Sequence, residues 1–194
     1  MKKLLLFAVL LIPIFCFGQK QNKDDIIKNW LDTGYFKIDD DNIVVSKVIN
    51  DVQGTKDEIY VRIENFFTRT YNDANSVIQT DNKQSGTIIG KGLFMLNYMT
   101  YSCFHVLRVD IKENKVRIIC SADVMNTHSI HYPSSSADDY KIVDYYPITN
   151  KGKFIPKSSQ AEAFIRLIKI MHTTIDTVEK TIKEGAIKGE NDNW

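Results

Sequence analysis

Apolar and polar residues alternate along much of the middle of the chain, with the period of two that is typical of half-buried β-strands. Clusters of Asp, Asn, Gly and Ser, which favour turns, bound the stretches that have this pattern. The pattern predicts five strands, at residues 42–49, 75–80, 86–96, 100–111 and 115–125. A further apolar stretch at residues 140–148 is a candidate edge strand.

Two other segments have apolar residues at helical spacing. The first begins with Thr55 and Glu58, the sequence signature of a capping box, and predicts an amphipathic helix of about four turns. The second begins with another capping box, Ser159 with Glu162, and carries one apolar seam that stops before Gly185. Five strands with one helix after the first of them predict an α+β domain.

The register of the last two strands follows from their two-residue turn. When Lys112 faces Lys115, one side of the hairpin is apolar apart from His105, and Asp110 faces Arg117 on the other side. Opposite charges across a ladder are favourable. A slip by one residue would destroy both patterns, so this register is the expected one.

The same register separates the two cysteines of this hairpin. Cys120 faces Leu107 and Cys103 faces Val124, so the two thiols share a face but lie four residues apart along the ladder. At about 3.4 Å per residue that separation exceeds the reach of a disulfide. We therefore expect two free, buried thiols that act as small apolar side chains.

The stretch "SGTIIGKGLF", residues 85–94, looks at first like a phosphate-binding loop. A loop of the G-x-x-x-x-G-K-[ST] type would need glycine at Ser85 and a hydroxyl residue at Gly92, and it would open a helix rather than continue as a strand. Glycine within a strand more often marks a close approach of another element. One side of this strand, on which a helix could pack closely, holds Gly86, Ile88, Gly90 and Gly92.

The segment "KDEIYVRIENFFTRTYNDANSVIQTDNKQSGTIIGKGLF", residues 56–94, resembles a family of exported bacterial proteins described as a domain of unknown function with a TBP-like fold. The resemblance rests on the Asp-Glu-Ile-Tyr helix start, the Phe-Phe pair near the helix end and the Val-Ile-Gln hairpin that runs into the glycines. It extends over roughly residues 44–126. It implies a curved antiparallel sheet of about five strands with two helices packed on one face, and it implies no chemistry, because fold does not carry function.

The N-terminus has the pattern of a secretory signal peptide, residues 1–18, with two lysines, a short apolar run and a cleavage position after Gly18. A lipoprotein signal ending at Cys16 is disfavoured by the bulky Phe15 before it. Export to the periplasm or the medium is therefore expected, with no membrane-spanning segment in the mature chain.

The remainder divides into three parts. Residues 19–41 are a polar lead-in with a short helix at 24–31, residues 42–184 form a single TBP-like α+β domain, and residues 185–194 are a flexible tail. The net charge of the chain is +1, which predicts no long-range attraction to nucleic acid. No cofactor motif is present, so no cofactor is expected.

The leading interpretation is a non-enzymatic binding module of the cell envelope. Its partner, an envelope protein or a small ligand, would contact the sheet face that the helices leave uncovered. A mixture of apolar and charged side chains suits such a surface. The expected binding residues are Phe104, Val106, Arg108, Arg117, Ile119 and Asp123.

Two alternatives remain open. The loop of residues 126–140 contains His128 and His131, with Asp138 and Asp139 nearby, so a metal-dependent hydrolase is the second interpretation. The third is a structural envelope subunit that forms a homodimer through its C-terminal helix. An acidic turn before residue 42 could attract calcium, but it lacks the spacing of a calcium loop.

Overall fold

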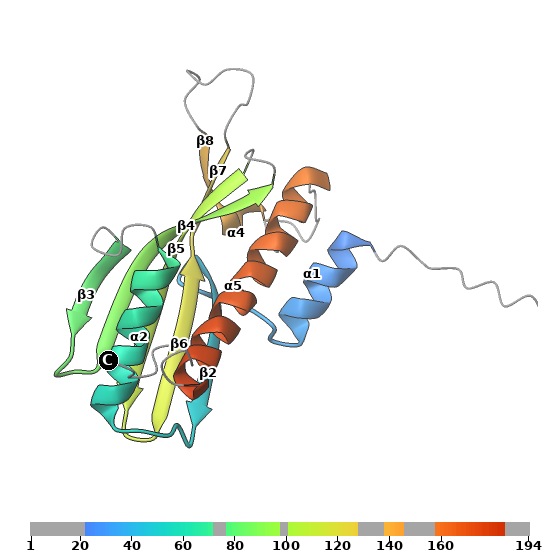
Figure 1. Cartoon of the computed structure of the whole chain (residues 1–194). Coiled ribbons are helices and arrows are strands. Elements are labelled where there is room, and N and C mark those ends of the chain that lie inside the picture. The colour runs from blue at the N-terminus through green and yellow to red at the C-terminus, as the bar shows by residue number, and fades with distance from the viewer. Residues whose placement is uncertain (1–21, 72–76, 98–100, 128–137, 146–157, 185–194) are drawn as a thin grey trace, which may run out of the picture.

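The computed structural model describes residues 22–71, 77–97, 101–127, 138–145 and 158–184. These residues form four helices and eight strands, shown in Figure 1. In chain order they are α1 (Lys23–Asp32), β1 (Lys37–Asp39), β2 (Asn42–Asn50), α2 (Lys56–Thr70), β3 (Ile78–Asn82), β4 (Thr87–Asn97), β5 (Tyr101–Lys112), β6 (Lys115–Ala122), β7 (Val124–Thr127), β8 (Asp138–Lys141), α4 (Ile142–Tyr145) and α5 (Ser158–Glu184).

The strands form one curved antiparallel sheet in the order β1-β2-β6-β5-β4-β3, with β7 joined to β5 and to β8. Helices α2 and α5 lie side by side on one face of this sheet, and α1 lies next to α5 (Figure 1). The α+β class and the helices on one face are confirmed. The sheet has more strands than the expected five. Strand β1 has only three residues, too few to show a period, and the predicted strand 115–125 is divided at Asp123 into β6 and β7. The candidate edge strand at 140–148 is wrong at Ile142–Tyr145, which form helix α4, and the end of β8 lies at its start.

Local signals position α2 as expected. The Thr55 hydroxyl accepts a hydrogen bond from the Glu58 backbone N–H at 3.2 Å, and the Glu58 carboxylate accepts one from the Thr55 N–H at 2.8 Å. This capping box satisfies two backbone donors at the helix start. The apolar side of the helix is buried against the sheet, with Ile59, Tyr60, Ile63, Phe66 and Phe67 in the core.

The apolar seam of α5 is buried in the core of the same chain. At most 1% of each side chain in the seam is exposed, for Phe164, Ile168, Met171, Ile175, Val178 and Ile182. The seam therefore covers the sheet and is not available for a coiled coil with another molecule, which removes the basis of the proposed dimer through this helix.

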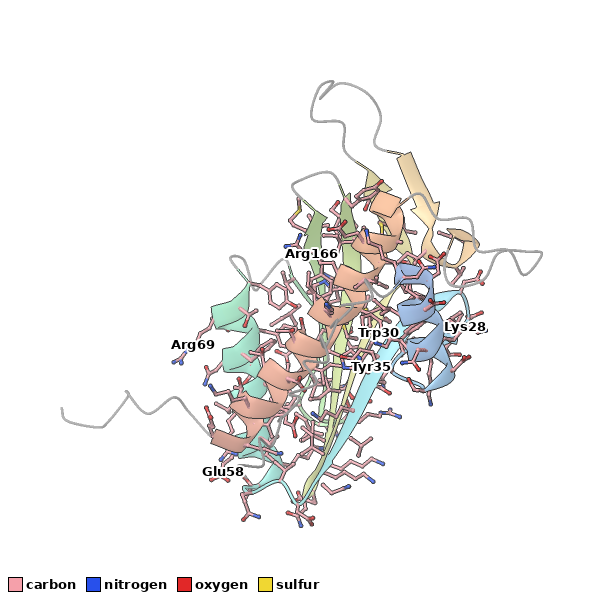
Figure 2. The ribbon with its side chains drawn as sticks, turned by 90° about the vertical axis from the view of Figure 1, so that its right-hand side faces the viewer. Lys28, Trp30, Tyr35, Glu58, Arg69 and Arg166 are labelled. Atoms are coloured by element: carbon pink, nitrogen blue, oxygen red, sulfur yellow. The ribbon has the colours of Figure 1, made fainter. Side chains whose placement is uncertain are left out.

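The N-terminal segment contributes more to the domain than its polar composition suggests. Ile27 of α1 and Phe36 before β1 are fully buried in the core. The Tyr35 ring stacks on His172 of α5 with centroids 3.7 Å apart, and Trp30 lies beside Tyr35 (Figure 2). From residue 22 onward, the expected lead-in is packed against the domain.

The glycines of β4 permit close packing, as the sequence suggested. Thr87–Asn97 continues as a strand, so the phosphate-loop geometry is absent here. A Cβ atom at Gly90 would overlap the ring of Phe67 from α2, and one at Gly92 would lie 2.6 Å from atoms of both Tyr71 and His105. Glycine at these two positions lets α2 approach the sheet.

The hairpin of β5 and β6 has the predicted register from Lys112–Lys115 to Leu107–Cys120. The prediction fails at the far end, where Cys103 faces Met125 and not Val124. One extra residue lies between the two strands at Asp123, so β7 restarts out of step with β6. Both cysteines are buried and free, as expected.

Several sequence-based predictions concern segments outside the described residues. These are the signal peptide at 1–18, the histidines His128 and His131 and the tail at 185–194. Within the described residues, no helix is long and apolar enough to span a membrane.

Candidate binding surface

One face of the sheet is not covered by α2 or α5, and we call it the open face. Its position follows from the alternation of side chains along β5, where Cys103, His105 and Leu107 are buried while Phe104 and Val106 are exposed. The exposed set of β5 continues onto the neighbouring strands through the ladder. Leu93 of β4 faces Phe104, and Ile119 of β6 faces Arg108.

Five of the six predicted binding residues lie together on this face. Those on β5 and β6 are Phe104, Val106, Arg108, Arg117 and Ile119. Asp123 is exposed but lies at the break between β6 and β7, where its backbone oxygen accepts a hydrogen bond from the Ile142 N–H at 2.9 Å. It does not continue the ladder of the other five, because the register ends at the extra residue.

Four adjacent side chains make part of the open face apolar, and we call them the apolar patch. Leu93 and Met95 of β4 are 48% and 47% exposed, and Phe104 and Val106 of β5 are 45% and 37% exposed. The Lys91 ammonium lies 4.9 Å from the centroid of the Phe104 ring, within the range of a cation–π contact. Contiguous exposed apolar surface of this kind marks interaction sites.

Next to the patch, three charged side chains form what we call the charged cluster. Asp110 accepts hydrogen bonds from Arg108 Nε at 2.9 and 3.1 Å and from Arg117 at 3.0 and 2.6 Å. Thr87 also donates to Asp110 at 3.1 Å. Partial burial alone would raise the pKa of Asp110, but the hydrogen bonds from Arg117 and Arg108 outweigh it and hold this pKa below its usual value.

The open face of the three central strands is strongly basic. On β4, β5 and β6 its only described carboxylate is Asp110, whereas its cations are Lys91, Arg108, Lys112, Lys115 and Arg117. The chain as a whole has a net charge of only +1. The chain is nearly neutral as a whole, but the sheet places an excess of positive charge on the open face.

A cleft of about 610 Å³ lies at the β1 side of the open face. The turn between β1 and β2 forms one wall, and β6 contributes side chains from the central sheet. Its lining residues are Lys37, Ile38, Asp39, Asp40, Asn42, Val44, Ser46, Arg117, Ile119 and Ser121. The cleft extends the open face into a concave region that holds hydroxyl, amide and charged groups.

The acidic turn beside this cleft is a tight hairpin loop. Asp40 and Asp41 both have positive φ, 46° and 64°, as in a type I′ turn. Asp41 pairs with Lys141 at 3.0 Å, and the Asn42 side chain donates to the Asp40 backbone oxygen at 2.9 Å. No group of three or more potential metal ligands occurs among the described residues.

His105, on the helix side of β5, is a core residue. Its ring stacks on Phe94 with centroids 3.6 Å apart, and its Nε2 lies 2.9 Å from the Tyr71 hydroxyl. Its Nδ1 atom is buried without a hydrogen-bond partner. Burial lowers the pKa of His105 to about 4, so the ring is neutral at physiological pH. A buried neutral imidazole in this position serves packing.

Sequence analysis missed three exposed residues of the surface, Lys91, Leu93 and Met95. The signal was present in the alternation of β4. Once Gly90 and Gly92 are assigned to the helix side, the residues between and after them must point to the open face.

A family model matches the central part of the chain. Residues 46–121 match the family model of a domain of unknown function, DUF4468, with TBP-like fold. This match confirms the resemblance drawn from the helix start and the glycine-rich strand. No curated protein sequence matches the chain significantly.

Two solved structures have the same fold. A TBP-like protein from Parabacteroides distasonis is 17% identical, with a TM-score of 0.58 over 76% of this chain and 97% of its own. A DUF4468 family protein from Bacteroides ovatus is 15% identical, with a TM-score of 0.60 over 90% of this chain and 99% of its own. At these identities the likeness establishes the fold alone.

Proposed function

We propose that the domain is an exported, non-enzymatic binding module that holds a protein partner on the open face of its sheet. The observation that carries the proposal is the apolar patch. Leu93, Met95, Phe104 and Val106 are neighbours on two adjacent strands, and each is more than a third exposed. Leaving this much apolar side-chain surface in water is unfavourable unless a partner covers it.

The charges around the patch favour a partner with acidic side chains. Lys91 and Arg108 flank the patch, and cations outnumber carboxylates on the central strands of the open face. A partner surface that combines apolar side chains with Asp or Glu would complement both features. Such charge complementarity mainly raises the association rate and selects among partners.

The first experiment identifies the partner and places the contact. A photo-reactive amino acid is introduced at Leu93 in living cells, with Val61 as the matched control. Val61 is 45% exposed, close to the 48% of Leu93, but it lies on the outer side of α2. A protein that crosslinks at position 93 and not at position 61 is then purified.

The second experiment measures the affinity of that protein for variants of the domain. We expect Phe104→Ser and Arg108→Glu each to weaken binding by roughly tenfold or more, because exposed aromatic and arginine side chains dominate interface energies. Val61→Ser should change the affinity by less than about twofold. Unchanged affinity in Phe104→Ser and in a combined Arg108→Glu and Ile119→Ser variant would refute the proposal.

The proposed compartment rests on the N-terminal sequence and has its own test. The lysines, the short apolar run and the small residue at Gly18 favour cleavage after residue 18. Intact-mass measurement of the protein recovered from cell fractions should show a chain that begins at Gln19, outside the cytoplasm. A chain that retains residues 1–18 in the cytoplasm would contradict export and leave the test of the open face unaffected.

A further inference from the structure

One edge of the sheet is only partly covered. Strand β1 pairs with β2 only at Asn42–Val44, whereas β2 continues to Asn50 and pairs with β6 along its other side. In the part of the chain that the structure describes, no strand pairs with the outer side of Ser46–Asn50. We call these five residues the free edge. Ser46, Lys47 and Val48 are all exposed in succession, which interrupts the burial alternation of β2.

The free edge has few of the devices that protect sheet edges from pairing, such as bulges, prolines and outward charges. The opposite edge strand, β3, is short and polar and has a register shift between Ile78 and Thr80. By contrast, β2 pairs with β6 without interruption from residue 43 to residue 50, and it is rich in β-branched residues. The free edge is therefore regular enough to accept another strand.

The single charge on the free edge is directed elsewhere. The Lys47 ammonium contacts Asp176 at 3.0 Å and Glu179 at 2.5 Å, both on α5. Hydrogen bonds to Glu179 and then to Asp176 raise the pKa of Lys47. The positive charge of Lys47 is therefore compensated by two carboxylates of α5. It does not point outward from the edge, where it would disfavour pairing with another strand.

We propose that the free edge pairs with the free edge of a second copy of this chain, antiparallel about a two-fold axis perpendicular to the sheet. An antiparallel pair of identical strands satisfies such an axis, so the edge is complementary to itself. Residues that face each other across an antiparallel ladder must share a face of the sheet. Along β2, residues separated by an even number of positions share a face of the sheet. Val48 can therefore face Val48 of the second copy, Lys47 can face its Ile49, and Ser46 can face its Asn50.

The ends of the free edge match this register. At one end a cleft of about 510 Å³ lies between Val45 and Ser46 of β2 and the segment around Tyr35 that leads into β1. Pairing with a second copy therefore cannot extend past Ser46 toward β1. At the other end Asp51 has a φ of 56°, and the chain bends away from the sheet. Five residues per copy remain, and they are the five that the register centred on Val48 uses.

This pairing also accounts for an exposed valine. Val48 is 48% exposed, and in the proposed register it packs against its own equivalent across the axis. The axis keeps both open faces on the same side, so the dimer would present two apolar patches on one continuous sheet. An interface of this length buries less than the roughly 1,600 Å² of a standard complex, and the dimer should therefore depend on concentration.

Sedimentation equilibrium tests the proposal with two matched variants of the full chain. Val48→Lys places two ammonium groups opposite each other at the axis, while Val61→Lys makes the same change at a valine of similar exposure, 45%, on α2. We expect the wild type and Val61→Lys to dimerise between low micromolar and submillimolar concentrations. Val48→Lys should weaken dimerisation at least about tenfold, because like charges directly opposite are unfavourable.

A crosslinking measurement tests the register and does not require a weakened variant. Facing residues have Cβ atoms about 4.5–5.5 Å apart, so Val48→Cys should form a disulfide-linked dimer under mild oxidation, while Val61→Cys should not. The two native cysteines of the domain are buried, and Cys16 is replaced by serine in both variants, so that no native thiol competes. Circular dichroism confirms that each variant is folded. A wild type that stays monomeric throughout, or equal crosslinking at positions 48 and 61, would overturn the proposal.

Discussion

The aromatic ring of Phe67 lies in the space that a side chain at residue 90 would occupy, so Gly90 and Phe67 are complementary in shape. Phe67 is fully buried, and it belongs to the side of α2 that faces the sheet. This contact determines how closely the helix approaches β4. It also explains why a strand that carries the open face on one side has glycines on the other.

The first prediction concerns this contact. Gly90→Ala should destabilise the domain by about 1–3 kcal/mol, because the added methyl group must displace a buried ring in a closely packed core. Urea unfolding followed by circular dichroism measures the change in the free energy of unfolding. A double-mutant cycle with Phe67→Ala supplies the control, because the methyl group at position 90 has room once the ring is removed. Equal costs of Gly90→Ala in both backgrounds would show that the contact is not the cause.

The second prediction concerns the pH dependence of stability. His105 has an ordinary pKa of 6.5 when unfolded and a pKa of about 4 in the folded protein. Between these values the unfolded chain binds a proton that the folded protein does not, so the free energy of unfolding falls as the pH falls. As the pH is lowered, the contribution of His105 to this decrease should begin near pH 6.5. Between there and pH 4, the free energy of unfolding should fall by up to about 1.4 kcal/mol for each pH unit.

A variant without the imidazole isolates this contribution. Replacing His105 by Leu together with Tyr71 by Phe removes the titrating ring and leaves no buried hydroxyl without its partner. The stability of this double variant should decline less steeply than that of the wild type between pH 6.5 and pH 4. Parallel curves over this interval would mean that the folded and unfolded states protonate His105 alike.

The third prediction concerns the charged cluster. Asp110→Asn should lower the free energy of unfolding at neutral pH by about 1 kcal/mol, because Arg108 and Arg117 lose the carboxylate that separates them. The folded pKa of Asp110 lies below its unfolded value, so its contribution is present above the unfolded pKa and is lost as the pH falls through the folded pKa. The wild type and the variant should therefore converge in acid.

Asp41→Asn provides the comparison for this experiment. Asp41 makes one exposed ion pair with Lys141, in which the side chains are 64% and 57% exposed. Exposed pairs of this kind contribute little, so the change should be below about 0.5 kcal/mol. If Asp110→Asn had an equally small effect, the cluster would not differ from an ordinary surface pair.

Local patterns in the sequence were sufficient for the hairpin and for α2. The alternation around Lys112 and Lys115 predicts which side chains share a face, and Thr55 with Glu58 predicts where the helix begins. Both signals act over a few residues and do not depend on the rest of the fold. The extra residue at Asp123 has no such signal, since it depends on how β7 meets β5 and β8.

Features of the candidate surface depend on the assembled sheet. Lys91 and Arg117 lie on β4 and β6, so nothing in the order of the sequence shows that they share one basic face. The free edge at Val48 likewise follows from the shortness of β1, and a three-residue strand is too short to predict from periodicity. Composition alone therefore indicates a near-neutral protein, whereas the fold gathers positive charges on the open face.

The fourth prediction concerns the turn between β1 and β2, beside the cleft on the open face. Asp41 has a φ of 64°, in the left-handed region that glycine adopts without steric cost. Asp41→Gly removes this strain and also removes the exposed ion pair with Lys141, and the strain is the larger of the two effects. We expect a gain of about 0.5 kcal/mol in the free energy of unfolding.

The matched control for this turn is Asp39→Gly. Asp39 lies at the end of β1 and pairs with Asn42, so glycine there gains no left-handed freedom and weakens the strand. Thermal unfolding should show a higher midpoint for Asp41→Gly and a lower one for Asp39→Gly. A loss of stability in Asp41→Gly would mean that its carboxylate, through Lys141 of β8, contributes more to the domain than an exposed ion pair normally does.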